Sequence, residues 1–184
     1  MGFKMKNLML LLIFLSLLTN CKKNIHCNDD ELTLERMNYT GNQLNIDGYY
    51  YGDADSNNSM PFANIYYLYR NGVFFTSEAS DLDKAEAGTI TVDFENFFGK
   101  TVKGAWGVFQ INGNNIEIER WRSRTNGCEI TIYERGDILN DSTFVINKRE
   151  YRNNGKAEKV ETPNSIFYFR SLTEKPDSTN NYIK

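Results

Sequence analysis

The 184-residue sequence predicts an all-β fold, namely an antiparallel meander β-barrel or a strongly curved sheet, with at most one or two short helices. Short apolar segments recur along the chain, and within them polar and apolar residues alternate with the period of two that is typical of half-buried strands. Gly and Asn residues separate these segments, as in tight turns. No long window has helical periodicity, so we expect strands to build the core.

The first predicted strands lie in the segment from residue 44 to residue 76. Residues 44–51 alternate and end in three consecutive tyrosines. Residues 64–70 and 73–76 are two further apolar segments with Asn71-Gly72 between them. An Asn-Gly pair is a strong hairpin signal because both residues tolerate positive φ angles.

The second half of the chain repeats this pattern. Residues 89–94 predict a strand that leads into a helical turn ended by Gly99. Residues 106–111 run into Asn112-Gly113, a second hairpin signal. The remaining predicted strands are 116–121, 128–133, 143–147 and 166–169, with turns at Gly136-Asp137, 153–155 and 162–164.

The first twenty residues have the pattern of an export signal. Lys4 and Lys6 precede an apolar run at residues 8–18, which is shorter than the roughly 20 residues of a membrane-spanning helix. The run ends in Leu18-Thr19-Asn20-Cys21. This string resembles the lipobox of bacterial lipoproteins, and the resemblance implies cleavage before Cys21 and membrane anchoring through acyl chains on its side chain.

The residue that follows Cys21 indicates whether the lipoprotein is expected at the inner or the outer membrane. In lipoproteins of this kind an Asp there often signals retention at the inner membrane, whereas this chain has Lys22. The resemblance therefore implies an outer-membrane lipoprotein of the cell envelope. An ordinary cleaved signal and an uncleaved anchor are the two alternatives.

The other two cysteines are Cys27 and Cys128. The envelope is an oxidising compartment and two is an even count, so we predict a Cys27–Cys128 disulfide. The alternative is two separate thiols. The chain has no Cys-x-x-Cys motif, which argues against a redox enzyme.

Composition divides the chain into four parts. We expect a signal peptide at residues 1–20, a lipidated polar tether at 21–40, a β domain at 41–173 and a flexible C-terminal tail at 174–184.

The β domain also resembles a known family. Residues 104–119 read Gly-Ala-Trp-Gly-Val-Phe-Gln-Ile-Asn-Gly-Asn-Asn-Ile-Glu-Ile-Glu, and a second hairpin follows at 130–138. Over roughly residues 44–170 the chain is similar to small lipocalin-like (calycin-type) lipoproteins. The resemblance implies a β-barrel in which an arginine near the last strand, Arg170 here, packs on Trp106.

Several function classes are disfavoured. The formal net charge of −3 argues against a nucleic-acid partner. His26 is the only histidine, and the Asp-rich residues 53–57 lack the Gly and Glu of a calcium loop. Glu117 and Glu119 lie two residues apart on one strand face, which fits either a pair of glycosidase carboxylates or an ordinary solvent-facing side, and we expect the latter. We predict no metal, no cofactor and no enzymatic activity.

Aromatic residues, 14% of the chain, are the best indication of a site. They occur at consecutive positions, so both faces of the sheet must carry rings. Barrel core with cross-strand aromatic pairs is one explanation, and a ligand cavity or a protein or glycan contact patch is another. The candidate ligand-binding residues are Tyr50, Tyr67, Trp106, Arg120 and Trp121.

Arg120 is the most informative of these candidates. By alternation it follows Ile116 and Ile118 on the inward face, and Glu134 is the expected cross-strand partner. A buried arginine must be paired or face a wet cavity. We expect either a polar floor for the acid group of a ligand, or two strand ends that lie beyond the core.

The sequence thus favours a lipocalin-like envelope module that binds a small hydrophobic ligand. The alternative is a non-catalytic structural or protein-interaction lipoprotein with a solidly packed barrel, whose partner is another envelope protein.

Overall fold

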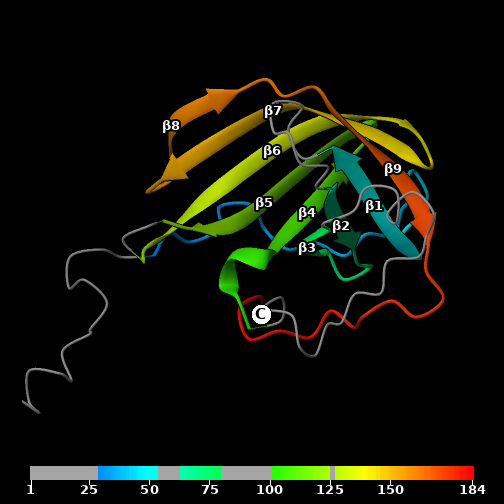
Figure 1. Ribbon diagram of the computed structural model, residues 1–184, viewed down its shortest axis with the longest axis horizontal. Coiled ribbons are helices and arrows are strands. Elements are labelled where there is room, and N and C mark those ends of the chain that lie inside the picture. The colour runs from blue at the N-terminus through cyan, green and yellow to red at the C-terminus, as the bar shows by residue number, and fades with distance from the viewer. Residues whose placement is uncertain (1–28, 54–62, 80–100, 125–126) are drawn as a thin grey trace, which may run out of the picture.

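The structure is a computed structural model that describes residues 29–53, 63–79, 101–124 and 127–184 (Figure 1). In these ranges the chain is all-β apart from one short 3-10 helix, η1 (Lys103–Ala105). The strands are β1 (Gly48–Asp53), β2 (Ala63–Leu68), β3 (Val73–Ala79), β4 (Trp106–Asn112), β5 (Asn115–Ser123), β6 (Glu129–Asn140), β7 (Thr143–Asn153), β8 (Lys156–Glu161) and β9 (Ser165–Ser171).

Eight of these strands close into an antiparallel barrel, which confirms the predicted fold class. The strand order is β6-β5-β4-β3-β2-β1-β9-β7, and pairing of β6 with β7 joins the two ends. The ninth strand, β8, pairs with the second half of β7. Closure satisfies the backbone groups that an open sheet would leave at its edges.

Both Asn-Gly hairpins form as predicted. Gly72 joins β2 to β3 with a φ of 77°, and Gly113 joins β4 to β5 with a φ of 59°. The turn predicted at Gly136-Asp137 is wrong, because β6 continues through it to Asn140. Gly136 instead lies at a β-bulge, where a Cβ atom would lie 1.9 Å from the carbonyl oxygen of Val145.

The structure differs from the sequence-based expectation at two further strands. β1 begins at Gly48, four residues later than the predicted strand at 44–51. The sequence also missed β8, since its residues are almost all exposed and its charged side chains do not alternate with apolar ones. The strand predicted at 89–94, the residues 53–57 except Asp53, and residues 1–28 lie outside the described ranges.

The two ends of the barrel differ. The β2–β3, β4–β5 and β6–β7 turns meet at one end, and residues 39–47 cross it with Leu44 and Ile46 buried among the interior side chains. We call this the closed end. The opposite end, where β5 ends at Ser123 and β6 begins at Glu129, is called the rim.

Aromatic rings fill the interior near the closed end. Tyr66 stacks on Phe167 at a centroid distance of 4.4 Å, and Phe167 stacks on Phe144 at 5.0 Å. The interior cluster comprises Tyr39, Leu44, Ile46, Tyr50, Tyr66, Leu68, Phe74, Phe109, Ile116, Ile118, Ile138, Phe144, Ile146 and Phe167. An eight-stranded barrel is only just wide enough for its own side chains, so this half is a packed core.

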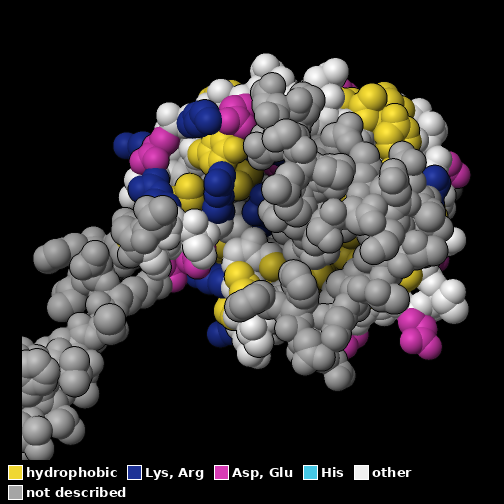
Figure 2. Space-filling view, in the orientation of Figure 1, with side chains coloured by type: hydrophobic (Ala, Val, Ile, Leu, Met, Phe, Trp, Pro, Cys, Tyr) yellow, Lys and Arg dark blue, Asp and Glu magenta, His cyan; other side chains and the backbone are white. Residues whose placement is uncertain are grey.

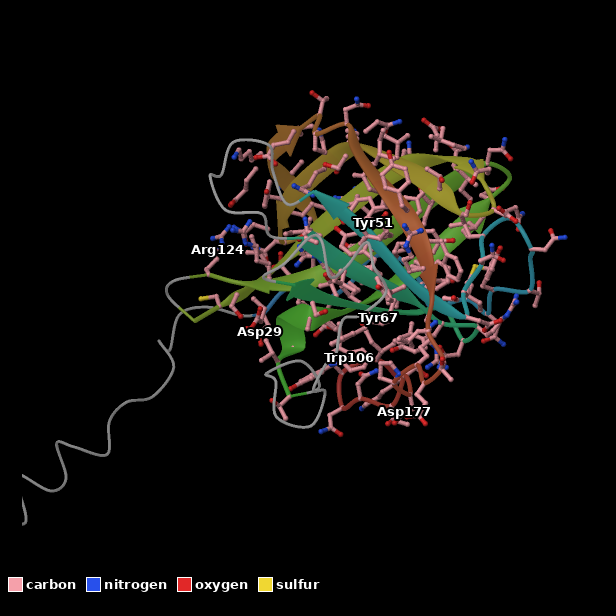
Figure 3. The ribbon with its side chains drawn as sticks, turned by 45° about the vertical axis from the view of Figure 1, so that its right-hand side comes forward. Asp29, Tyr51, Tyr67, Trp106, Arg124 and Asp177 are labelled. Carbon is pink, nitrogen blue, oxygen red and sulfur yellow. The ribbon has the colours of Figure 1, made fainter. Side chains whose placement is uncertain are left out.

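A second aromatic cluster lies on the outer face of β1 to β4. It contains Tyr49, Tyr51, Ala63, Ile65, Tyr67, Tyr69, Val73, Phe75 and Trp106. Tyr51, Tyr67 and Trp106 face the same side of the molecule as the C-terminal segment (Figure 3). Leu172, Tyr182 and Ile183 pack against the cluster, so the C-terminal segment covers part of it.

Polar contacts also hold the C-terminal residues against the barrel. The Lys175 ammonium donates to the carbonyl oxygens of Ile46 and Leu68, the latter at 2.5 Å. The Tyr182 hydroxyl donates to the carbonyl oxygen of Thr101 at 2.5 Å. Residues 174–184, which composition assigned to a flexible tail, thus form a second layer over the outer aromatic cluster.

Candidate ligand site

A layer of three polar side chains crosses the barrel interior above the aromatic core. Tyr66 on β2 reaches across to β6, where its hydroxyl donates to Oε2 of Glu134 at 2.8 Å. Arg149 on β7 donates from Nε to Oε1 of the same carboxylate at 2.6 Å. We call Tyr66, Glu134 and Arg149 the polar layer.

The polar layer is a satisfied buried ion pair. The Glu134 side chain is 0% exposed and that of Arg149 is 12% exposed. A buried carboxylate is tolerated only when it is paired and hydrogen-bonded, and Glu134 meets both conditions. Burial, followed by the neighbouring Glu134 charge, raises the pKa of Tyr66, which therefore keeps its proton and remains a donor.

A β-bulge decides which cation meets Glu134. In the β6–β7 ladder Gly136 pairs with Ile146 but Arg135 pairs with Lys148, so Asn147 is an extra residue. The bulge moves Arg149, rather than Lys148, opposite Glu134. Simple alternation counted from the turn does not reveal this pairing, and the sequence therefore missed both Arg149 and Tyr66 as site residues.

Arg120 lies next to the polar layer, on its rim side. It is paired with Gly107 and Ile132 across the two neighbouring ladders, which places it on the inner face as predicted. Its Nη1 donates to the carbonyl oxygen of Trp121 at 3.5 Å, and its buried Nε has no hydrogen-bond acceptor. Among the described residues no carboxylate forms an ion pair with it.

The predicted Arg120–Glu134 pair is therefore replaced by the Arg149–Glu134 pair. Glu134 faces Ile118 on one side and Arg149 on the other, whereas Arg120 faces Ile132. The register thus separates Arg120 from the carboxylate by two residues along the ladder. Neither residue lies beyond the core, because Glu134 is fully buried and the Arg120 Nε is buried as well.

Charged groups also surround Tyr151 on the rim side of the polar layer. The Arg122 guanidinium and the Lys159 ammonium each lie 5.3 Å from the centre of the Tyr151 ring. The Tyr151 hydroxyl donates to Glu161 at 3.1 Å, and Glu161 lies 3.8 Å from Arg149. This half of the barrel therefore combines charged groups with the buried Ile130 and Ile132, in contrast to the aromatic closed half.

The structure does not bring the five predicted ligand-binding residues together. Tyr50 and Arg120 lie on the inner face. Tyr50 belongs to the filled closed half, where its hydroxyl donates to the carbonyl oxygen of Asn45 at 2.8 Å. Tyr67, Trp106 and Trp121 lie on the outer face of β2, β4 and β5 and point away from the interior.

The two tryptophans pack on the outside of the barrel. Trp106 lies against Phe75 at a centroid distance of 4.7 Å. The Trp121 indole nitrogen donates to the carbonyl oxygen of Asp30 at 2.8 Å. Arg170, which the family resemblance places on Trp106, has its guanidinium 5.3 Å from the centre of the Tyr51 ring.

Residues 29–38 form a strap on the outer face of β5, where composition indicated a polar tether. The backbone N–H groups of Thr33 and Leu34 both donate to Oε2 of Glu119 at 2.6 Å. Glu119 is 0% exposed and has Arg152 3.8 Å away. The buried Glu119 carboxylate therefore accepts the hydrogen bonds that hold the strap against β5.

The Glu117–Glu119 pair divides between two structural roles. Glu117 accepts hydrogen bonds from Tyr133 and Arg135, both at 2.5 Å. The Tyr133 hydrogen bond is the main cause of the lowered pKa of Glu117, although burial opposes it. Because Glu119 binds the strap and Glu117 binds its neighbours, these carboxylates are not arranged as an acid–base pair.

Cys128 is buried, and Cys27, its predicted disulfide partner, lies outside the described residues. The neighbouring backbone supports the predicted pairing with Cys27. Asp30 donates to the carbonyl oxygen of Glu129 at 2.9 Å, and the Glu129 N–H donates to Asp29 at 3.1 Å. Residues 29 and 30 thus lie directly beside the residue that follows Cys128.

Comparisons with known proteins assign no family to this chain. No family model, no curated protein and no solved structure matches it. In the part of the chain that the structure describes, no helix is long and apolar enough to cross a membrane. The described ranges also contain no group of three His, Cys, Asp or Glu side chains placed to hold a metal ion.

Proposed function

We propose that this chain is an outer-membrane lipoprotein, anchored through acyl chains on Cys21, whose barrel binds a small amphipathic molecule at its rim. The anionic group of that molecule is bound by Arg120, and its apolar part lies against the rim-side wall. The protein acts by binding and not by catalysis.

One observation carries this proposal, namely that no carboxylate among the described residues forms an ion pair with the inward-facing Arg120. Tyr66 and Arg149 both engage Glu134, so the buried carboxylate of the polar layer is already paired. An inward-facing guanidinium with a buried Nε that lacks an acceptor favours an anion from outside the chain.

The packed closed half limits the size of the ligand. Phe144, Phe167 and the ring of Tyr66 fill the interior between the closed end and the polar layer. A long hydrophobic chain therefore has no room to enter deeply, and we expect a compact ligand that remains above the layer. This refines the hydrophobic cup expected from the sequence.

Fluorescent anionic amphiphiles test the proposal. We expect the wild-type protein to bind 1-anilinonaphthalene-8-sulfonate or dansylglycine, two compact anionic amphiphiles. Arg120→Gln should weaken binding about tenfold or more, because a hydrogen bond to a charged group contributes about 1.5–3 kcal/mol. Arg135→Gln, an exposed arginine on the outer face of β6, is the matched control and should leave binding unchanged.

The second candidate is a structural or protein-interaction lipoprotein with a filled barrel, and the aromatic stack in the closed half favours it. In that case the wild-type protein would not bind either probe, or both arginine variants would bind as well as the wild type. Its partner would then be another envelope protein.

A further inference from the structure

We propose that the rim of the barrel faces the bilayer in which the acyl chains of Cys21 are embedded, so that the Arg120 site is entered from the membrane side. This inference rests on the anchoring of Cys21 in the proposed function. The partner surface is the layer of phospholipid headgroups.

The strap begins at the rim. The Asp30 carboxylate accepts hydrogen bonds from the N–H of Asn154, in the β7–β8 turn, at 2.8 and 2.9 Å. The Asp30 N–H donates to Glu129, the first residue of β6. Figure 3 shows Asp29 at the same end of the molecule as Arg124, which follows β5.

From the rim the strap runs along the outer wall to the closed end. Glu119 holds Thr33 and Leu34, and Gln110 then donates to the carbonyl oxygen of Glu35 at 2.8 Å. The N–H of Tyr39 donates to Arg70 in the β2–β3 turn. Followed in the opposite direction, toward Cys21, the chain therefore leaves the barrel at the rim.

The length of chain between Cys21 and Asp29 favours this orientation. Eight residue steps span at most about 26–29 Å when fully extended. The barrel is about 20 Å long, since the nine-residue strand β5 rises about 3.3 Å per residue and strands tilt by about 40°. To present the closed end, the tether would have to double back along most of the wall.

Charge does not distinguish the two ends of the barrel. Figure 2 shows Lys and Arg side chains interspersed with Asp and Glu side chains on the left of the visible face, over the rim ends of β5 to β8. The path of the strap, rather than charge, is therefore the basis of the proposed orientation.

Site-specific fluorescence quenching measures the orientation. The acylated full-length protein, with p-azidophenylalanine coupled to a fluorophore, is reconstituted in vesicles of phosphatidylethanolamine and phosphatidylglycerol that contain headgroup-spin-labelled lipid. The label is placed at Ala157 near the rim or at Asn114 in the β4–β5 turn, two exposed uncharged positions. We expect severalfold stronger quenching at Ala157 than at Asn114.

A strap variant tests the cause of the orientation. Glu119→Gln places an amide N–H₂ group among the N–H donors of the strap, and we expect the difference in quenching between the two labels to shrink. Glu117→Gln, on the same strand and face, does not touch the strap and should preserve the difference. Circular dichroism confirms that both variants fold.

Three outcomes would overturn the orientation, namely equal quenching at both labels, stronger quenching at Asn114, or no quenching at either. Incorporation of radiolabelled palmitate, with Cys21→Ala as control, is measured first, and only acylated protein enters the experiment. A failure of anchoring is thereby distinguished from a failure of orientation, and probe binding by Arg120 is measured independently of both.

Discussion

Two buried carboxylates, Glu134 and Glu119, organise the two faces of the same barrel wall. Both are 0% exposed, and each is held by donors from a distant part of the chain. Glu134 connects β6 to Tyr66 across the interior, and Glu119 connects β5 to the strap. Removing either set of donors would leave a buried charge unpaired, which is far more costly than losing a surface ion pair.

Lys175 is a third buried charge, and its titration is measurable. Burial, assisted by nearby Arg70, lowers its pKa to about 8. Between pH 8 and 10 the unfolded chain binds more protons at this position than the folded chain, so stability rises with pH. Relative to Lys175→Met, the wild type should gain up to about 1.4 kcal/mol per pH unit in this window.

Urea unfolding at a series of pH values checks the Lys175 prediction. The difference between wild type and variant isolates this group from the tyrosines, whose unfolded pKa lies near 10. Lys156→Met, at an exposed position on β8, should track the wild type across the window. A Lys175→Met difference that is constant or shrinks with pH would contradict the assignment.

At the scale of the strand, glycines decide how closely neighbouring elements approach. A Cβ atom at Gly107 on β4 would lie 2.2 Å from the carbonyl oxygen of Glu119 on β5. Gly107 also faces Arg120 across the β4–β5 ladder, so the close approach lies beside the candidate site. The same residue type in η1, Gly104, has no atom within 3.4 Å of such a Cβ.

We therefore expect Gly107→Ala to destabilise the protein by about 1–3 kcal/mol, because the added methyl group overpacks the β4–β5 ladder. Gly104→Ala should change the free energy of unfolding by no more than about 0.5 kcal/mol. Chemical denaturation of the two variants beside the wild type is the measurement. Equal effects of the two substitutions would show that crowding at Gly107 does not decide its identity.

At the scale of the whole molecule, segments from both ends of the chain cover the barrel wall. The strap lies over β5, and the C-terminal residues cover the outer aromatic cluster of β1 to β4. The outer rings are therefore buried by the chain itself, where the sequence left a ligand, a partner or loops as candidates for covering them.

The predicted Cys27–Cys128 bridge would fasten the start of the strap to β6. Closing a loop of roughly 100 residues contributes about 4–5 kcal/mol in the chain-entropy description. We expect Cys27→Ser to reduce stability by about that amount, and to make stability insensitive to reductant.

Urea unfolding with and without reductant, together with intact mass after alkylation of free thiols, tests the bridge. In the wild type neither Cys27 nor Cys128 should be alkylated before reduction. If Cys128 of the Cys27→Ser variant resisted alkylation in denaturant until reductant was added, the partner of Cys128 would be Cys21 and the lipoprotein assignment would fail with it.

Alternation and turn chemistry in the sequence were sufficient for the fold class, both Asn-Gly hairpins and the inward direction of Arg120. These features depend on neighbours a few residues apart, where the pleat of a strand and the φ preference of glycine act directly. The same local rules predicted a turn at Gly136, which instead lies at a β-bulge. They also missed β8, because its charged and exposed residues show no clear alternation of polar and apolar side chains.

Only the tertiary structure decided which groups meet. The bulge at Asn147 places Arg149 opposite Glu134, and barrel closure brings Tyr66 from β2 to the same carboxylate. That pairing leaves Arg120 without a counterion among the described residues and so defines the candidate site. The sequence alone determined that this chain forms a barrel with rings on both faces, whereas register and closure, which depend on all the strands together, determined where its charges lie.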